Sequence, residues 1–348
     1  MNINTQTNRR RAIKCVVWDL DHTLWDGVLL ENDQVSLREN VASIIHTLDN
    51  RGILQSIASK NDYTFAMQKL QDFDLDGFFL FPQIGWNSKV SFIETIAQCI
   101  NIGLEAVAFI DDEPFERGAV HFSMPEVLCI DAANLDQVLD MPEMNPRFIT
   151  VDSKMRRKMY LNDMARNKVE EDFVGPKEAF LASLNMALTI FPAKEEDLRR
   201  AEELTLRTNQ LNATGYTYSY DELNHFRQSD GHKLLMTRLE DNYGTYGHVG
   251  LALIECYADL WVIKLLLMSC RVMSRGVGSI LLSHLIQLAK HNNVRLQAEF
   301  VPNDRNRMMD ITYRFAGFNE VDEIEGHIVF EHDLNNSQPF PDYVKVDI

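Results

Sequence analysis

The sequence predicts an α/β protein with two domains: a doubly wound parallel sheet without a large cap, followed by a smaller α+β domain. Short apolar runs alternate with amphipathic stretches from residue 12 to about 132, which is the pattern of a parallel sheet. From about residue 183, apolar runs follow one another more directly, as in antiparallel strands. The 348 residues suffice for two domains, and 45% apolar and 24% charged residues are typical of a soluble globular protein.

We place the first domain at residues 1–133. The expected strands are 13–18, 53–58, 78–82, 106–110 and 126–130, and the expected helices are about 38–51, 62–73 and 88–101. Between Asp19 and Ser59 there is room only for a short flap and one helix, and between Ser59 and Lys89 only for a helix and a strand. A site at this sheet is therefore open to a bulky substrate or to closure by the second domain.

The stretch Lys14 to Val28, KCVVWDLDHTLWDGV, organises the first domain. Its apolar residues 15–18 predict a buried parallel strand, and Asp19 and Asp21 follow at the carboxyl end, where open α/β sheets bind ligands. One carboxylate there can attack phosphorus, and a second can protonate the leaving group. Such an acidic pair alone is also common in solvated turns.

Further polar residues follow the next expected strands and precede a helix. Ser59 ends the strand IAS and offers a hydroxyl to a phosphoryl oxygen, Lys89 begins an amphipathic stretch and can neutralise phosphate, and Asp111 and Asp112 end the strand VAFI. In this order the four motifs resemble those of the haloacid-dehalogenase (HAD) phosphohydrolase superfamily. The resemblance implies a phosphate clamp of Ser59 and Lys89 and a Mg²⁺ site that involves Asp19, Asp21, Asp111 and Asp112.

A charged helical connector is expected at residues 134–182, broken by Gly175 and Pro176. The second domain is placed at 183–333, and residues 334–348 are expected to be a C-terminal tail. Expected elements of this domain are strands at 186–193, 232–241, 248–258, 259–270, 296–302 and 327–334, and helices at 195–212, 279–292 and 306–317.

This order resembles the GCN5-related N-acetyltransferase (GNAT) fold, in which a glycine-rich turn at a helix amino terminus binds the pyrophosphate of a pantetheine carrier. Gly276 and Gly278 match that turn, whereas Met273 occupies its first, usually polar position. Arg271 and Arg275 flank the turn and are candidates to meet a phosphopantetheine phosphate.

Cys270 precedes this turn and follows an apolar strand. A neighbouring guanidinium and a helix amino terminus favour a thiolate, so Cys270 is a candidate nucleophile, although a core cysteine at a strand end fits its position as well. The other four cysteines lie within expected strands or on a helix without a cationic neighbour, at positions 15, 99, 129 and 256.

Taken together, the segments DLDHTLWDGVL, SKND, FIDDEPFER, RTNQLNATG, SCRVMSRGV and YRFAGF resemble the FkbH-like family of glyceryl-acyl-carrier-protein synthases of polyketide biosynthesis, from Ile13 to Phe330. The resemblance implies that 1,3-bisphosphoglycerate loses phosphate, that Cys270 carries the glyceryl group as a thioester, and that the phosphopantetheine thiol of an acyl carrier protein accepts it. The family's turn usually reads RVLGRGVE, so Ser274 and Gly278 are departures.

The remaining candidates have weaker signals. Asn209, Gln210 and Asn212 match the family's TNQ-x-N segment and are candidates to hold substrate hydroxyls, or they form a helix C-cap. His248, His284, His327 and His332 are candidate bases for Cys270, and no spacing selects one of them. A local basic patch for the carrier protein is expected from Arg156, Arg157 and Lys158 together with Arg271 and Arg275.

Composition excludes other classes. A net charge of −17 argues against nucleic acid as the main partner, and five cysteines without a C-x-x-C pair argue against a disulfide framework or a zinc site. The longest apolar run, Leu260 to Met268, is interrupted by Lys264 and too short for a bilayer. The amino terminus MNINTQTNRRR lacks a secretory core, so we expect a cytoplasmic protein without a membrane partner.

Three alternatives stay open. The chain is a small-molecule phosphatase with an accessory second domain, an acyltransferase that uses acyl-coenzyme A, or a noncatalytic docking protein. Met273 in the pyrophosphate turn argues against the second, and the intact set of Asp19, Asp21, Lys89 and Asp112 argues against the third.

Overall fold

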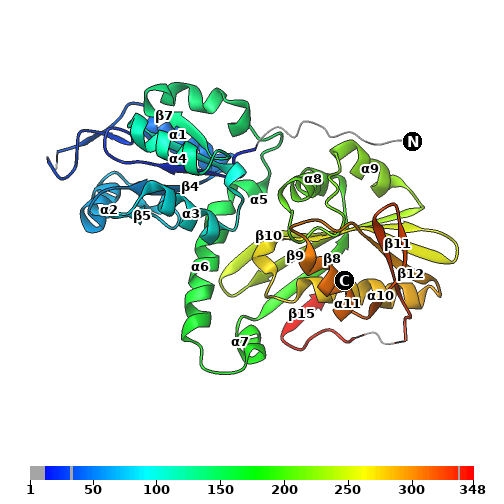
Figure 1. Ribbon diagram of the computed structural model, residues 1–348. Helices are drawn as coiled ribbons and strands as arrows, with labels where there is room; N and C mark the ends of the chain where they lie inside the picture. The colour runs from blue at the N-terminus through cyan, green and yellow to red at the C-terminus, as the bar shows by residue number, and fades with distance from the viewer. Residues whose placement is uncertain (1–11, 32–33, 336–337) are drawn as a thin grey trace. The chain divides into compact units, whose positions relative to one another are not determined.

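The computed structural model describes residues 12–31, 34–335 and 338–348, and the chain divides into two units between Leu161 and Asn162. This boundary falls inside helix α6 (Arg156–Asp172), within the stretch expected as a connector. Each unit has a large sheet of its own (Figure 1). Among the described residues, none of the helices combines the length and the apolar character needed to cross a lipid bilayer.

The first unit contains a five-stranded sheet in the order β5-β4-β1-β6-β7, in which every pair is parallel. All four residues of the central strand β1 are buried, as its continuous apolar sequence predicts. The order of the strands reverses at β1, which separates β4 from β6 and creates the crevice where such sheets bind ligands. The bounds are β1 Cys15–Trp18, β4 Leu54–Ser59, β5 Gln83–Ile84, β6 Val107–Asp111 and β7 Leu128–Asp131.

Short loops and side-chain caps begin the helices directly after the strands. Asp62 accepts hydrogen bonds from two backbone amides of α2, Ser88 caps α3, and Glu113 caps α4. The helices are α1 Val41–Asn50, α2 Tyr63–Asp72, α3 Lys89–Ile100, α4 Pro114–Ser123 and α5 Val151–Lys154. Because only the hairpin β2 (Trp25–Asp26) and β3 (Ser36–Leu37) and helix α1 separate β1 from β4 among the described residues, the expected absence of a large cap is confirmed.

One strand of this sheet lies later than predicted. We expected a strand at 78–82, but residues Asp76–Phe78 form a 3₁₀ turn and β5 contains only Gln83 and Ile84. Phe81 has φ 52°, a left-handed conformation that interrupts an extended chain. The apolar run packs into the core as irregular backbone, with Phe79 and Leu80 both buried.

The second unit contains an eight-stranded mixed sheet in the order β13-β14-β12-β11-β10-β9-β8-β15. The predicted antiparallel meander is present as β9, β10 and β11. One face packs against α10 and α11 and the other against α8 and α9. The strands are β8 Met186–Pro192, β9 His232–Asp241, β10 Gly244–Cys256, β11 Leu260–Met268, β12 Arg295–Phe300, β13 Phe318–Ile324, β14 His327–His332 and β15 Val344–Asp347. The helices are α7 Lys177–Ser183, α8 Leu198–Arg207, α9 Tyr220–Gln228, α10 Val277–His291 and α11 Arg307–Phe315.

These elements confirm the predicted fold class, a parallel α/β sheet followed by an α+β domain. Four elements were not anticipated, namely α4 in the first unit and α9, β13 and β15 in the second. The segment 334–348, expected to be a tail, contains β15, which pairs in parallel with β8 and so belongs to the sheet. The helix expected at 195–212 is also shorter, because α8 ends at Arg207 and Thr208 is already extended.

Strands β11 and β12 pair only from Leu260 to Ile263 and then diverge. The segment Leu211–Ala213, which follows α8, fills the space between them. Ala213 N donates to Leu266 O at 3.0 Å, Met268 N donates to Leu211 O at 2.9 Å, and Val301 N donates to Ala213 O at 3.0 Å. The free edge of β11 that leads to Cys270 is therefore covered by the chain's own backbone.

Candidate functional site

Three carboxylates gather where β1 and β6 end. Asp19 follows β1, Asp111 is the last residue of β6, and Asp112 comes next; one ligand atom from each lies within 4.8 Å of the others. The two strands are neighbours in parallel register, and Asp19 N donates to Ile110 O at 2.9 Å, which continues the ladder to the site. Asp19 and Asp111 are buried, whereas Asp112 is half-buried. Oxygen ligands of this kind suit Mg²⁺.

Lys89, the first residue of α3, lies between two of these carboxylates. Its ammonium nitrogen is 2.9 Å from Oδ1 of Asp19 and 2.5 Å from Oδ2 of Asp111, and the side chain is only 5% exposed. Lys89 pairs with two of the three clustered carboxylates, so the group keeps a negative charge that a divalent cation would offset. The residues present therefore fit a bound cation.

Burial dominates the electrostatics of the site. It raises the pKa of Asp19 to about 6, although Lys89 and a hydrogen bond from Ser59 act in the opposite direction. Burial raises the pKa of Asp111 too. Burial opposes the charge of Lys89, but Asp19 and Asp111 outweigh it, so the pKa of Lys89 is raised as well.

Thr23 ties the loop after β1 to Asp112. The Thr23 hydroxyl donates to Oδ1 of Asp112 at 3.3 Å, and the Asp112 backbone N–H donates to the same hydroxyl at 3.0 Å. Thr23 is fully buried, so this reciprocal pair fixes Asp112 relative to Asp19. The sequence analysis did not assign Thr23 a site role, although its place two residues after Asp21 in a turn was a usable signal.

The carboxylate of Asp21 is not part of the group of three, and its role as a metal ligand stays a prediction. It accepts hydrogen bonds from the indole N–H of Trp25, the backbone N–H of Leu29 and the side-chain amide of Asn61. Its side chain is thus oriented by the protein. Neither Trp25 nor Asn61 was predicted as a site residue.

In the second unit, Cys270 begins a 3₁₀ turn, Cys270–Val272, between β11 and α10. The thiol residue is half-buried. Gly276 caps α10 with φ 78°, a left-handed conformation, and a Cβ there would stand 2.4 Å from the Tyr343 hydroxyl oxygen. A Cβ at Gly278 would stand 2.6 Å from Cε of Met268. The left-handed backbone therefore favours glycine at position 276, whereas at position 278 a Cβ would require the flexible end of Met268 to move aside.

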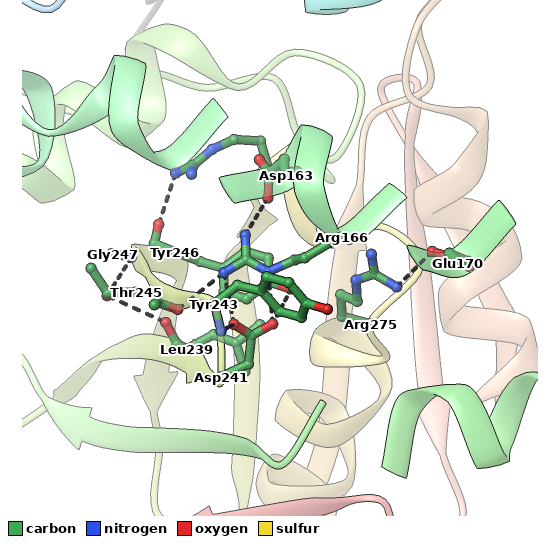
Figure 2. Close-up of polar contacts among 12 residues, drawn as sticks. Asp163, Arg166, Glu170, Leu239, Asp241, Tyr243, Thr245, Tyr246, Gly247 and Arg275 are labelled. Carbon is green, nitrogen blue, oxygen red and sulfur yellow. Dashed lines mark hydrogen bonds and ion pairs between the residues drawn. The ribbon is translucent and has the colours of Figure 1, made fainter. Parts of the chain in front are cut away.

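The two arginines that flank this turn point into the protein, which differs from the expected contact with phosphopantetheine. Arg275 is only 4% exposed and pairs with Glu170 of α6 at 3.0 Å, and Arg271 donates to Tyr246 O at 2.8 Å. Figure 2 shows Arg275 beside Glu170. Arg275 is buried and Arg271 is half-buried, and contact of either with a phosphopantetheine phosphate stays a prediction.

Figure 2 also shows Arg166 paired with Asp241. Both side chains of this ion pair are fully buried. Arg166 donates to both carboxylate oxygens of Asp241 at 2.7 and 2.8 Å, and to Asp163 at 2.7 Å. Its guanidinium carbon lies 3.8 Å from the centre of the Tyr246 ring. This network attaches the second half of α6 to the β9–β10 hairpin.

The other part of the expected basic patch is also engaged. Arg156 is buried and donates to Gly52 O, and Arg157 donates to both carboxylate oxygens of Asp49 at 2.9 and 3.1 Å. Of the three basic residues expected at this position, only Lys158 is exposed. Most of the basic side chains that we expected to bind a carrier protein therefore make hydrogen bonds or ion pairs within the chain itself.

Asn212 has a structural role. It is fully buried, its amide oxygen accepts from Thr214 N and Gly215 N, and its amide nitrogen donates to Tyr216 O. Asn306, which the sequence analysis missed, donates to the carbonyl oxygens of Asn212, Ala213 and Val301. Of the other two candidates of the segment, Asn209 is half-buried and Gln210 is exposed, and their role stays a prediction.

The four candidate histidines have separate surroundings. His284 and His332 are buried, and burial lowers the pKa of both. His248 lies 3.7 Å from Asp197, and His327 lies 3.2 Å from the Tyr216 hydroxyl. None of these contacts identifies a base for Cys270.

Comparisons with known proteins agree with the geometry of the first unit. No family model matches the sequence. Over 143 residues, 36% of the chain, it is 29% identical to human magnesium-dependent phosphatase 1 and covers 80% of that protein. The N-terminal part of a Bacteroides fragilis protein, which contains a phosphatase domain complexed with Mg, is 25% identical with a TM-score of 0.33; the match covers 44% of this chain and 40% of that one.

A second solved structure is similar to part of the chain. The ribosomal-protein-S18-alanine N-acetyltransferase of Escherichia coli is 21% identical with a TM-score of 0.33, and the match covers 42% of this chain and 92% of that one. The chain is thus similar in sequence to a magnesium-dependent phosphatase over 36% of its length.

Proposed function

We propose that the first unit is a Mg²⁺-dependent phosphoryl-transfer site. The observation that carries the proposal is the group of Asp19, Asp111 and Asp112 with Lys89 among them, at the switch point of a parallel sheet. The sequence similarity to a magnesium-dependent phosphatase supports the same assignment.

In this proposal each residue has one role. Asp19 attacks the phosphorus of a phosphate ester, the bond to the leaving oxygen breaks, and Asp21 gives that oxygen a proton. Water then hydrolyses the phosphoryl group from Asp19, and Asp21 takes a proton back. Ser59 and Lys89 hold phosphoryl oxygens. Asp19, Asp111 and Asp112 would hold Mg²⁺, which would supply positive charge to stabilise the negative charge of the phosphate.

The finer proposal is that the chain converts 1,3-bisphosphoglycerate into a glyceryl thioester. Asp19 and its neighbours remove the ester phosphate. The Cys270 thiolate attacks the acyl carbon of the mixed anhydride, the carbon–oxygen bond breaks, and phosphate leaves with the electron pair. The phosphopantetheine thiol of an acyl carrier protein next attacks the thioester, and Cys270 leaves as a thiolate. The resemblance of the segments around Asp19, Ser59, Asp111 and Cys270 to FkbH-like enzymes supports this sequence.

Intact-mass spectrometry tests the proposal. The full chain is incubated with Mg²⁺, 1,3-bisphosphoglycerate and a phosphopantetheinylated carrier protein, and the masses of the enzyme and the carrier are followed together with free phosphate. We expect a glyceryl adduct on the enzyme and then on the carrier. Cys270→Ser should lose both adducts and keep Mg²⁺ binding, whereas Asp19→Asn should lose release of the ester phosphate.

Two outcomes contradict the proposal. Wild-type release of the ester phosphate in excess EDTA would refute the role of Mg²⁺. Loading of the carrier by Cys270→Ala at the wild-type rate would mean direct transfer, and Cys270 would then be a core residue at a strand end.

A second candidate function is a phosphatase for small molecules whose second unit is an accessory domain. The inward orientation of Arg271 and Arg275 favours it, because these residues are engaged by Tyr246 and Glu170 instead of facing a carrier phosphate. The same arrangement weakens the acyl-coenzyme A alternative. In the experiment above, this candidate predicts phosphate release without an adduct on either protein.

A further inference from the structure

The carboxylate of Asp21 is held at both of its oxygens. Trp25 Nε1 donates to Oδ1 at 2.7 Å, Leu29 N donates to the same oxygen at 3.1 Å, and Asn61 Nδ2 donates to Oδ2 at 3.0 Å. With donors on both oxygens the carboxylate is not free to rotate about its terminal bond. Its orientation is therefore set by residues outside the group of three carboxylates.

Asn61 is itself rigid. Its side chain is fully buried, and its amide oxygen accepts from Asp62 N at 2.9 Å. This bond determines which end of the amide faces Asp21, since only the NH₂ end remains for it. Asp62 in turn caps α2 by accepting from Thr64 N and Phe65 N. The start of helix α2 thus orients the donor that faces Asp21.

Trp25 is rigid for a different reason. It is fully buried, it pairs with Leu37 in the hairpin β2–β3, and its ring lies 6.4 Å from that of Phe73. A buried indole usually finds a partner for its N–H, and here the partner is the carboxylate of Asp21, two residues after Asp19 in the chain. Two independent elements, the hairpin and α2, therefore converge on one side chain.

We propose that Asn61 and Trp25 are positioning residues that hold Asp21 for proton transfer to the leaving oxygen. This inference rests on the proposed phosphoryl transfer at Asp19. When the phosphorus–oxygen bond of an ester breaks, the leaving oxygen keeps the electron pair and takes the proton of Asp21. A leaving group that is stable as an anion needs this proton little, whereas a poorer leaving group depends on it.

The test uses two substrates of nearly equal shape, p-nitrophenyl phosphate and phenyl phosphate. They differ by one nitro group, which makes the phenolate a better leaving group. The full chain is assayed at saturating Mg²⁺ as wild type, Trp25→Phe and Asn61→Ser. Asn61→Ser shortens a buried side chain and so changes packing as well as the hydrogen bond. Trp25→Phe keeps an aromatic ring in place and removes the N–H donor. An effect shared by both variants is therefore due to the lost hydrogen bond and not to lost packing.

We expect the two wild-type rates to lie close together. Each variant should lower kcat for phenyl phosphate more than kcat for p-nitrophenyl phosphate, and the two decreases should differ at least about 10-fold. General acid catalysis contributes ~10²–10⁴-fold to a rate, so a difference of this size is available. Asp21→Asn sets the upper limit of this difference. Mg²⁺ binding, measured by calorimetry, should not change in either positioning variant.

Trp18→Phe is the matched control. Trp18 is also fully buried, and its Nε1 donates to Gln55 Oε1 at 3.2 Å instead of to a site carboxylate. It should lower both rates by the same factor. If Trp25→Phe and Asn61→Ser also leave the ratio of the two rates unchanged, the positioning role is refuted. A wild-type enzyme that cleaves neither substrate refutes the proposed phosphoryl transfer, and this inference with it.

Discussion

The ammonium nitrogen of Lys89 lies 2.9 Å from Oδ1 of Asp19, and both side chains are more than nine-tenths buried. Lys89 also contacts Asp111, so one side chain balances two buried carboxylates. A buried charge that loses its partner is far more costly than an exposed one. Lys89 is therefore as important to the folding of the first unit as to the proposed binding of phosphate.

Lys89→Met should lower the free energy of unfolding by about 3–5 kcal/mol in EDTA, because two carboxylates lose their counter-charge. Excess Mg²⁺ should restore part of that loss. Urea unfolding followed by tryptophan fluorescence measures both values. Lys60→Met is the matched control: Lys60 is exposed and pairs with Glu116, so its loss should change stability by at most about 1 kcal/mol.

Mg²⁺ affinity should fall as the pH is lowered through about 6, because burial raises the pKa of Asp19 to about 6 and the proton competes with the cation. The expected loss is roughly 10-fold for each pH unit below that value. Calorimetric titration of wild type at several pH values checks this. An affinity that stays constant down to pH 5 would contradict the assignment of Asp19.

In EDTA, the raised pKa of Asp19 should make the free energy of unfolding depend on pH. The native state binds a proton more tightly than the unfolded chain between the ordinary pKa of 3.8 and about 6, so the contribution of Asp19 to stability rises as the pH falls through this range. Asp19→Asn removes that contribution. The difference in unfolding free energy between wild type and Asp19→Asn should therefore depend on pH between these two values.

Arg166→Met should destabilise the second unit by about 3–5 kcal/mol, because Asp241 and Asp163 lose a buried partner. In the double variant Arg166→Met and Asp241→Asn, the loss should be smaller than the sum of the two single losses. Thermal unfolding of all four proteins measures this coupling. As a control, Arg314→Met removes exposed pairs with Asp310 and Glu320 and should change stability by at most about 1 kcal/mol.

Gly276→Ala should destabilise by roughly 1–3 kcal/mol, because φ is +78° and the added Cβ would stand 2.4 Å from the Tyr343 hydroxyl oxygen. Tyr343→Phe in the same chain should relieve the clash and leave the backbone strain. Denaturant titration measures the change. Gly118→Ala offers the opposite case: Gly118 lies in α4 with nothing within 4 Å of a Cβ, so the variant should gain up to about 1 kcal/mol.

The first unit was the more predictable part of the chain. Asp19 and Asp111 follow buried apolar strands, and parallel strands end at one edge of a sheet, so their meeting follows from the local pattern. Lys89 could be anticipated because it starts a helix after a Ser88 cap. Asn61 and Trp25 could not, because their partner Asp21 is recognisable only after the loops have folded.

The contacts of the arginines could not be anticipated from the sequence. Arg156, Arg157 and Arg275 resemble a solvated basic patch when only their neighbours in the sequence are considered. Their partners Gly52, Asp49 and Glu170 lie more than 100 positions away. Local charge patterning cannot distinguish an exposed cation from one that is paired through the fold.

Strands at the margins of the sheets were missed for another reason. Strand β13 has the sequence FNEVDEI, and six of its seven residues are exposed. Acidic residues are depleted in strands generally but protect edges, so the sequence resembles a loop unless its pairing with β14 is known. The same holds for the short β15, which depends on β8 for its pairing.

The segment Leu211–Ala213 between β11 and β12 has a consequence for amide hydrogen exchange. The N–H groups of Met268 and Val301 donate to carbonyl oxygens of this segment, and Ala213 N–H donates from the segment to β11. Detachment of the segment from the two strands therefore exposes all three N–H groups at once. Their deuterium uptake should follow one common opening free energy. Cys270 lies two residues beyond Met268, so the end of β11 that leads to the proposed nucleophile should loosen in the same opening event.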